Sequence, residues 1–318
     1  MLWISGPRLR ELVPMGAAID AVRGAFIASS RGTLEQPARL ALEGGRALAM
    51  LSADREGVGT VLKAVTVRPE NRQHALPAVQ AVVLWFDGPT GAPIALIDGT
   101  SLTALRTGAA SGVATDLLAS PDARVLGMIG AGGQAEDQVR AVCAVRPIRE
   151  VRVASRDPAH AARLAVRLGR ELAPVRVLAA GTVREAIRGA DLICTATTAT
   201  EPLFGVDDLA ADVHVNAVGA YTEAMCEVPE ALLTAASVVA VDQVAAAMAE
   251  AGDLLRAIRS GQLMREQLVE LGDLLARRFV SPGGWTVFKS VGIAAQDWAV
   301  ARLAVERARA SGAPHAEV

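Results

Sequence analysis

A glycine-rich turn lies near the middle of the 318-residue chain, in "VLGMIGAGGQAEDQ" (residues 125–138). Residues 130–135 match the pattern G-x-G-x-x-G/A, directly after an apolar run. Gly130 permits a tight turn, Gly132 lets an anion approach the backbone, and Ala135 lets the following helix pack closely. A purely structural turn is the alternative. Because a second strand-like run, "VRVAS", follows at the expected distance, the pattern predicts a dinucleotide site.

The end of that second run bears on which dinucleotide is bound. An NAD site usually has an acid about 20 residues after the glycines, for the ribose hydroxyl. Here the chain has Ser155 and Arg156, and a guanidinium is suited to a phosphate. NADP(H) is therefore favoured, and the neighbouring Asp157 keeps NAD(H) possible. The alternative for Arg156 is a solvated loop charge.

Two cations lie on apolar faces in the first third of the chain. In "VLKAVTV", Lys63 shares a strand face with three valines, and in "SLTALRTGAASGVA", Arg106 lies on an apolar helical stripe. A buried charge is costly unless it is paired, so an anionic ligand is expected. Structural ion pairs are the alternative, with Asp54, Glu56 or Asp98 as partners.

Hydrophobic periodicity predicts the elements that position these residues. A helix over 7–31 comes first, and a helix over about 100–119 ends the segment. Between them, successive strands without intervening helices predict an antiparallel sheet. The strand-like runs are 38–42, 46–52, 59–67, 78–86 and 93–98.

From residue 124, apolar runs alternate with helical stretches, which predicts a doubly wound parallel sheet. The last forty residues are predicted to be mostly helical, with "DWAVARLAVERARA" packing on the first domain. The predicted domains are 1–119, completed by 295–318, and 120–294. The strand-like runs are 125–129, 151–154, 175–178, 191–196, 213–218 and 237–241.

Composition and residue spacing exclude several kinds of partner and ligand. Hydrophobic residues make up 52%, charged residues 21%, and the net charge is −2 without a basic stripe, so no nucleic-acid partner is expected. No apolar run reaches about 18 residues and no signal-type segment is evident, which predicts a cytoplasmic protein without a membrane partner. Three widely spaced cysteines predict free thiols, and the four histidines lack ligand spacing, so no metal is expected.

Several motifs together resemble the ornithine cyclodeaminase/μ-crystallin family, over nearly the whole chain and in order. They are "RTGAASGVATDLLA", "IGAGGQA", "DLICTATTATEPLF", "VNAVGA", "AGDL" and "TVFKSVGIAAQD". The resemblance implies an N-terminal, mostly antiparallel α+β domain that binds substrate and forms a homodimer through its sheet. It also implies a Rossmann domain, with the active site in the cleft between the two.

The resemblance further implies roles for individual residues. Arg39, Lys63 and Arg106 would clamp a substrate carboxylate, with Arg106 also touching the cofactor and Val291 lying near the substrate. Gly133 and Gln134 would contact the pyrophosphate, and Ser155 and Arg156 the adenosine ribose. The nicotinamide half would lie along Thr195, Thr197, Ala217, Val218, Gly219 and Ser290.

This chain departs from the ornithine-specific members after "NAVG". Those members have "GGDCPGK-E", whereas this chain reads "GAYTEAMCE", with Tyr221 at the Asp position and Met225 at the Lys position. An acid that they place before "LMP" is also missing, since Leu48 or Ala49 stands there. A dicationic substrate needs carboxylates, so ornithine is disfavoured, although the nearby Glu223 and Glu227 keep it open.

We therefore predict an NAD(P)H-dependent oxidoreductase that transfers hydride between nicotinamide and the imine or amine carbon of a small α-imino or α-amino acid. Lys63 is the first candidate for the catalytic proton relay, and Tyr221, which otherwise is a packing residue, is the second. The alternatives are an ornithine cyclodeaminase and a non-catalytic, crystallin-like NADP(H)-binding protein.

Overall fold

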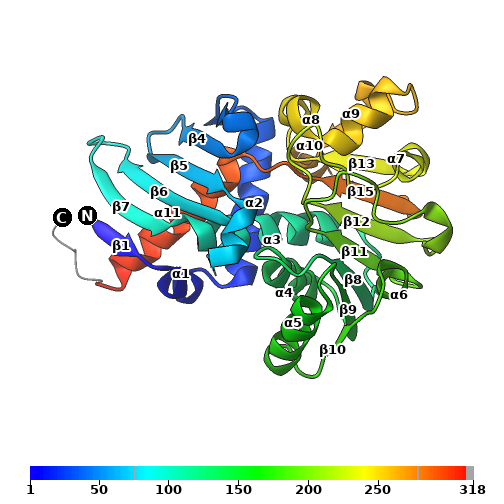
Figure 1. Ribbon diagram of the computed structural model, residues 1–318. Helices are drawn as coiled ribbons and strands as arrows, with labels where there is room; N and C mark the ends of the chain where they lie inside the picture. Colours follow the sequence, from blue (N-terminus) through cyan, green and yellow to red (C-terminus); the bar gives the residue numbers. More distant parts are fainter. Residues whose placement is uncertain (75, 278, 313–318) are drawn as a thin grey trace. The chain divides into compact units, whose positions relative to one another are not determined.

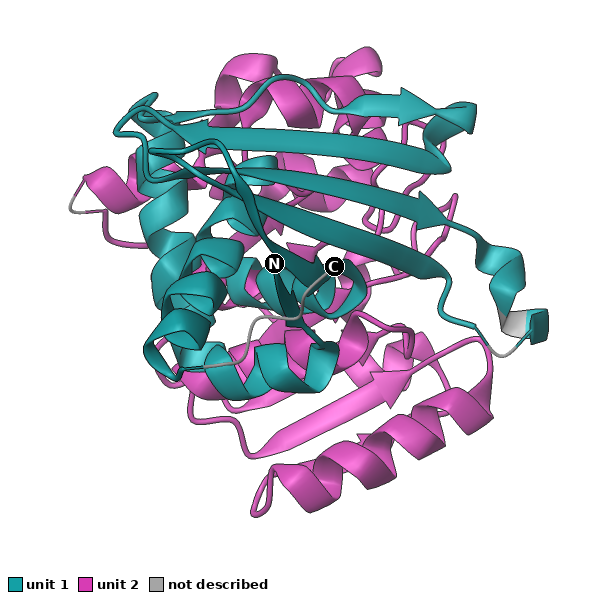
Figure 2. Cartoon of the chain, turned by 90° about the vertical axis from the view of Figure 1, so that its left-hand side faces the viewer, with its two compact units in different colours: residues 1–110, 293–318 teal, residues 111–292 magenta. Residues whose placement is uncertain are grey.

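The computed structural model describes residues 1–74, 76–277 and 279–312, and they form two compact units. Unit 1 comprises residues 1–110 together with 293 onwards, and unit 2 comprises residues 111–292 (Figure 2). The sequence predicts domain boundaries after residues 119 and 294. The structure divides the chain after residue 110, inside helix α3 (Gly99–Leu118), and after residue 292.

Unit 1 is built on a seven-stranded sheet of order β1-β7-β6-β5-β4-β2, with β3 paired to β4 (Figure 1). Its pairs are antiparallel except β1 with β7, so the sheet is mixed. The strands are β1 (Leu2–Ile4), β2 (Leu34–Glu35), β3 (Leu40–Leu42), β4 (Ala47–Asp54), β5 (Gly59–Val67), β6 (Val79–Asp87) and β7 (Pro93–Asp98).

Helices cover one face of this sheet. The C-terminal helix α11 (Ala294–Ala310) packs on α2 (Met15–Ser30) and on β4, β5 and β6. Along β5, Val61, Lys63, Val65 and Val67 are buried, while the side chains between them are more exposed. This is the alternation expected of a strand covered on one side.

The predicted helix over 7–31 is wrong as a single element. The structure has α1 (Gly6–Leu12) and α2, bent by 80° at the break between them. Pro14 lies at the break, as the residue preceding α2. Proline has no backbone N–H to donate and disfavours a helical residue before it, so α1 ends there.

Unit 2 is a Rossmann-type fold on an eight-stranded sheet in which every pair is parallel, of order β10-β9-β8-β11-β12-β15-β13-β14 (Figure 1). The strand order reverses between β8 and β11. The carboxyl ends of these two strands therefore form the topological switch point, where ligands bind in such sheets. The strands are β8 (Val125–Ile129), β9 (Glu150–Ala154), β10 (Arg176–Ala179), β11 (Leu192–Thr195), β12 (Val213–Ala217), β13 (Val238–Val241), β14 (Leu268–Glu270) and β15 (Trp285–Lys289).

Helices flank the sheet of unit 2. They are α4 (Ala135–Val145), α5 (Pro158–Glu171), α6 (Val183–Ile187), α7 (Glu230–Ala235), α8 (Val244–Glu250), α9 (Gly252–Arg259) and α10 (Leu271–Ala276). The doubly wound class is confirmed. The helix predicted over "DWAVARLAVERARA" is confirmed as part of α11, but the residues before it contain a strand, β15, where helix was expected. Its buried, β-branched and aromatic residues let it insert between β12 and β13.

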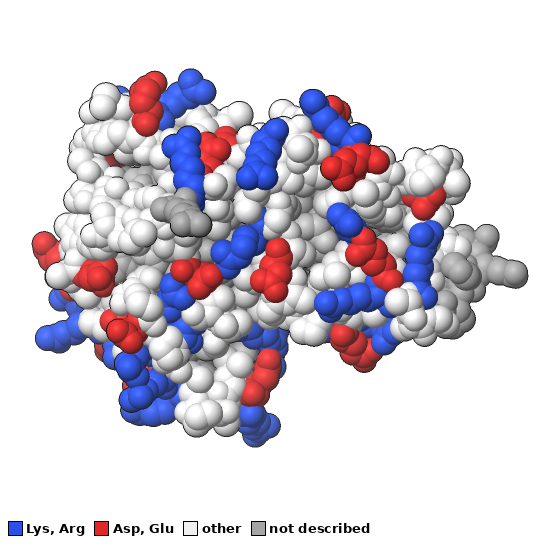
Figure 3. Space-filling view, turned by 180° about the vertical axis from the view of Figure 1, so that it is seen from behind, with Lys and Arg blue, Asp and Glu red and all other residues white. Residues whose placement is uncertain are grey.

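Among the described residues, no single helix is long and apolar enough to cross a membrane, although α1 and α2, as a bent pair, pass that test by length and composition. On the face seen in Figure 3, basic and acidic side chains are interspersed.

Candidate active site

The glycine turn follows β8 and is built so that only glycine fits its first position. Gly130 has φ of +107°, and its N–H donates to the Ala154 carbonyl at 2.9 Å. A Cβ at Gly130 would lie 2.4 Å from the carbonyl oxygen of Ala196, which follows the neighbouring strand β11. The turn is therefore held against the ends of both adjacent strands.

The middle of the turn is open. A Cβ at Gly132 or Gly133 would meet no atom within 4 Å. In the described part of the chain, the backbone N–H groups of residues 131–134 donate to no acceptor, and the buried Gln134 Oε1 has no partner. They stand at the N-terminus of the 11-residue helix α4, where the helix dipole favours an anion. This cradle fits the pyrophosphate of a dinucleotide.

Ser155 and Arg156 follow β9, the strand next to β8. Arg156 is exposed and forms no ion pair or hydrogen bond with any described residue. Asp157 is instead the N-cap of α5, where its carboxylate accepts from the Ala159 N–H at 2.9 Å and lies 3.5 Å from His160. The acid next to Arg156 is therefore committed to the helix, and the guanidinium is available to a ligand.

The residues predicted for the nicotinamide half come together at the same edge of unit 2. The Val218 N–H donates to the Thr195 carbonyl at 3.0 Å, and the Ser290 N–H donates to the Ala217 carbonyl at 3.1 Å. Thr195 is fully buried, and its hydroxyl has no partner among the described residues. A buried hydroxyl without a partner is costly, so it is a polar atom available to a ligand.

Unit 1 carries a buried cluster of opposite charges. Lys63 Nζ lies 2.7 Å from Asp297 Oδ2, and Arg106 Nε lies 3.1 Å from Asp297 Oδ1. Arg106 also donates to the Gln296 amide oxygen at 2.5 Å. Strand β5, helix α3 and the start of α11 each contribute to this cluster, which the local sequence around any one of them does not reveal.

The cluster changes the acidity of Lys63. Burial, followed by the charge of Arg106, lowers the pKa of Lys63 to about 7, against the opposing effect of Asp297. Arg39 is close enough to lower that pKa further, by a smaller amount. A lysine with this pKa exchanges a proton near neutral pH, which suits it to acid–base chemistry.

The ion-pair partners considered for Lys63 and Arg106 are wrong, because Asp297 pairs with both. Asp54 instead accepts three backbone N–H bonds within its own turn, and Asp98 accepts from the Ser101 N–H at the start of α3. Sequence reasoning missed Asp297 and Gln296. The signal that could have found them is "AAQDWAVA", in which two polar residues interrupt an apolar helix start.

The segment after β12 bears on the substrate. Tyr221 is half-buried, and Met225, at the position of a lysine in the ornithine-specific members, is buried. Of the two acids that could replace the missing carboxylates, Glu223 pairs with Arg259 at 2.6 Å on the surface. Glu227 is fully buried and accepts hydrogen bonds from the backbone of its own unit. Both acids are therefore engaged within unit 2.

Val291 lies in the segment between β15 and α11. Asp242, at the end of β13, accepts from the Ser290 hydroxyl at 2.9 Å and from the N–H groups of Val291 and Gly292 at 3.0 and 2.7 Å. Sequence reasoning missed this carboxylate, which holds both predicted ligand-binding residues of the segment.

A doubly wound sheet with an anion cradle at its switch point defines a dinucleotide-binding protein of the Rossmann class. The chain belongs to the ornithine cyclodeaminase/mu-crystallin family, whose sequence profile matches residues 7–312. It is 37% identical to a Delta(1)-pyrroline-2-carboxylate reductase of Bacillus cereus, over 97% of both chains.

Two solved structures extend the comparison. That of Thermococcus litoralis Delta(1)-pyrroline-2-carboxylate reductase, in complex with NADH and L-proline, has a TM-score of 0.94 at 33% identity and covers 100% of both chains. An archaeal alanine dehydrogenase dimer with bound NAD has a TM-score of 0.89 at 28% identity, over 99% of this chain and 98% of its own.

Proposed function

We propose that this protein is an NAD(P)H-dependent reductase of small α-imino acids, with a cyclic imino acid such as Δ1-pyrroline-2-carboxylate as substrate and the corresponding amino acid as product. The sequence identity of 37% to the Bacillus reductase, over 97% of both chains, supports this activity. The reverse reaction, oxidation of the amino acid, uses the same groups.

The observation that carries the proposal is the charge balance of the buried cluster in unit 1. Two buried cations, Lys63 and Arg106, share one carboxylate, that of Asp297, which leaves these three side chains with a net charge of +1 when Lys63 is protonated. The buried amide nitrogen of Gln296 also has no partner among the described residues. Excess buried charge is stable when a ligand neutralises it, and a guanidinium binds a carboxylate in a bidentate manner.

Each residue then has a separate task. Arg39 and Arg106 bind the carboxylate of the substrate and orient its C=N bond. Nicotinamide, when bound, would supply hydride to the imine carbon. Lys63 supplies the proton that the imine nitrogen needs, so that C=N plus hydride plus a proton gives the amine, and Asp297 holds the lysine in place.

We propose NADP(H) as the preferred cofactor. The exposed guanidinium of Arg156, which has no partner among the described residues, supports this preference, because a 2′-phosphate would give it one. The related structures were solved with NADH and NAD, so NAD(H) is the alternative.

We also propose a homodimer formed through the sheet of unit 1. The face of this sheet away from α2 and α11 carries exposed apolar side chains, among them Leu40 at 70% and Leu42 at 66% exposed. They line a groove of about 650 Å³ together with Trp3 and Val82. Such a patch is typical of an interface, and the similar alanine dehydrogenase is a dimer. Leu42→Asp is expected to give a monomer in sedimentation or light scattering.

Oxidation of NADPH and of NADH with a panel of substrates tests the activity. The panel contains cyclic imino acids, oxo-acids with ammonia or methylamine, and ornithine with the oxidised cofactor. Turnover of the cyclic imino acids supports the proposal. Release of ammonia from ornithine, or cofactor binding without turnover of any substrate, would contradict it.

Lys63→Ala tests the role of the lysine within that activity. The variant is expected to lose at least about a hundredfold in turnover while it still binds cofactor, since general acid catalysis contributes that much. Lys63→Arg is the matched variant, because it keeps the charge but does not release a proton near neutral pH. Unchanged turnover in either variant would remove Lys63 from the mechanism.

A further inference from the structure

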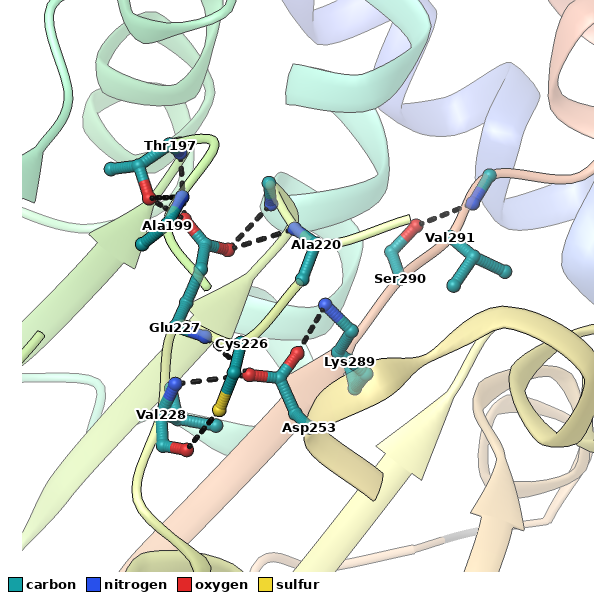
Figure 4. A network of polar contacts seen from close by, with 12 residues as sticks. Thr197, Ala199, Ala220, Cys226, Glu227, Val228, Asp253, Lys289, Ser290 and Val291 are labelled. Carbon is teal, nitrogen blue, oxygen red and sulfur yellow. Dashed lines mark hydrogen bonds and ion pairs between the residues drawn. The ribbon is translucent and has the colours of Figure 1, made fainter. Parts of the chain in front are cut away.

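Glu227 joins the two loops predicted to hold the nicotinamide half of the cofactor. Its side chain is fully buried in unit 2, between the loops after β11 and β12 (Figure 4). Oε1 accepts from the Thr197 N–H at 2.6 Å and from the Thr197 hydroxyl at 2.8 Å. Oε2 accepts from the N–H groups of Gly219 and Ala220 at 2.7 and 3.2 Å.

Four donors point at this carboxyl group, and a carboxylate has room for all of them. A protonated carboxyl would turn one acceptor position into a donor. Burial raises the pKa of Glu227 above its ordinary value, while Lys289 and the hydrogen bonds from Thr197 oppose that rise. Because three of the four donors are backbone N–H groups, which cannot accept a hydrogen bond, the geometry favours the ionised form.

Gly219 is the residue that lets the loops meet on one carboxylate. A Cβ at this position would lie 2.3 Å from the Thr197 nitrogen and 2.4 Å from Glu227 Oε1. Any side chain here would separate the loop after β12 from the loop after β11. The glycine and the glutamate therefore act together to fix the spacing of the two loops.

A second buried carboxylate holds Glu227 in place. Asp253, in the first turn of α9, accepts from the N–H groups of Glu227 and Val228 at 2.6 and 3.0 Å. Its other oxygen lies 2.8 Å from Lys289 Nζ, at the end of β15 (Figure 4). With one lysine against two carboxylates, the cluster has a net charge of −1.

We propose that Glu227 is a positioning residue for the nicotinamide ring, and that the net negative charge of the Glu227–Asp253–Lys289 cluster favours the oxidised ring over the reduced one. This inference rests on the proposed function. The oxidised ring is a cation and the reduced ring is neutral, so only the former gains from a nearby negative charge. When a nicotinamide is bound, this charge would therefore favour its oxidised form, which is the product of hydride donation.

The test measures binding rather than turnover. The dissociation constants of NADP⁺, of NADPH and of 2′-phospho-ADP-ribose, which lacks nicotinamide, are compared between the wild type and Glu227→Gln. The affinity for NADP⁺ is expected to fall by at least about tenfold more than that for NADPH, the size expected for loss of one nearby charge. The affinity for the fragment should be unchanged.

Two further variants sharpen the comparison. Asp253→Asn removes a charge while its side-chain oxygen still accepts from Glu227 and Val228, so it should shift the NADP⁺ to NADPH ratio in the same direction. Glu266→Gln, an exposed change in the same unit, is the control and should leave the ratio as in the wild type.

An equal loss of NADP⁺ and NADPH affinity in Glu227→Gln, a comparable loss for the fragment, or no change at all would overturn the inference. Failure of the proposed function gives a different result, because the wild type would then bind neither dinucleotide or reduce no imino acid.

Discussion

Lys63 and Asp297 form an ion pair with 2.7 Å between Nζ and Oδ2, and each side chain is only 1% exposed. The pair joins the middle of β5 to the first turn of α11, 234 residues apart in the chain. Burial and Arg106 push the lysine toward its neutral form, and Asp297 opposes them. The balance places the pKa of Lys63 at about 7, so small changes in this cluster should appear in the pH dependence of activity.

Asp297→Asn is expected to lower the pKa of Lys63 below 7, because it removes the charge that stabilises the ammonium form. In the proposed mechanism imine reduction uses protonated Lys63, so the alkaline limb of the pH profile should move down by about one unit. The measurement is kcat/KM against pH for the wild type and the variant.

Glu306→Gln is the matched control for this change. Glu306 lies on the same helix and pairs with Arg302 on the surface, so its pH profile should overlay that of the wild type. An alkaline limb that stays in place in Asp297→Asn would mean that Lys63 is not the group that limits activity.

The glycine turn allows steric and ligand effects to be separated. Gly130→Ala is expected to destabilise unit 2 by about 2 kcal/mol or more, because the residue has φ of +107° and its Cβ would clash with Ala196. Gly132→Ala meets no atom within 4 Å, so the melting temperature should be unchanged.

The methyl group of Gly132→Ala would occupy the space predicted for the pyrophosphate, and the affinity of this variant for the dinucleotide should fall by at least about tenfold. Thermal unfolding without cofactor and cofactor titration of both variants check the pair. Wild-type affinity in a folded Gly132→Ala would place the pyrophosphate elsewhere.

Much of unit 2 could be predicted from the sequence because its signals are local. Each parallel strand is a short apolar run, and Gly130 is required by the sterics of its own turn. The exceptions are the short edge strand β14, "LVE", and β15. Strand β15, "WTVFK", lies late in the chain but in the interior of the sheet. Nothing in its five residues specifies that β12 and β13 leave a place between them.

The polar partners could not be predicted because they are distant in the sequence. Lys63 and Arg106 are evident as cations on apolar faces, but their common partner, Asp297, lies on the final helix. The motif "AGDL" (residues 251–254) marks the family resemblance but does not by itself predict a role for its residues. In the structure a Cβ at Gly252 would lie 2.1 Å from the Met225 carbonyl oxygen. Asp253 accepts from the N–H groups of Glu227 and Val228. Close packing and hydrogen bonds explain both residues.

Arg156→Ala tests the cofactor preference. The variant is expected to lower kcat/KM for NADPH by about tenfold or more, since a charged hydrogen bond to phosphate is lost, while the value for NADH changes by less than about twofold. Arg163→Ala, an exposed arginine of α5, is the control and should change neither value. Equal effects of Arg156→Ala on NADH and NADPH would contradict a role in binding the 2′-phosphate.

His214 is expected to make unit 2 less stable in acid. The ring is 1% exposed, and its nitrogens lie 2.9 Å from the Thr286 hydroxyl and 3.2 Å from the Asn216 amide oxygen. Burial lowers the pKa of His214 to about 4, from 6.5. Between these two pH values the unfolded chain binds a proton that the folded chain does not, so the free energy of unfolding falls as the pH falls.

The expected loss from His214 is about 3 kcal/mol from pH 6.5 to pH 4, and it is absent above pH 6.5. Urea unfolding across this range should show a steeper slope in the wild type than in His214→Gln, which starts less stable but has no group to protonate. His160→Asn changes a histidine that is 38% exposed and should retain the wild-type slope. Parallel curves for the wild type and His214→Gln would assign the acid sensitivity to other groups.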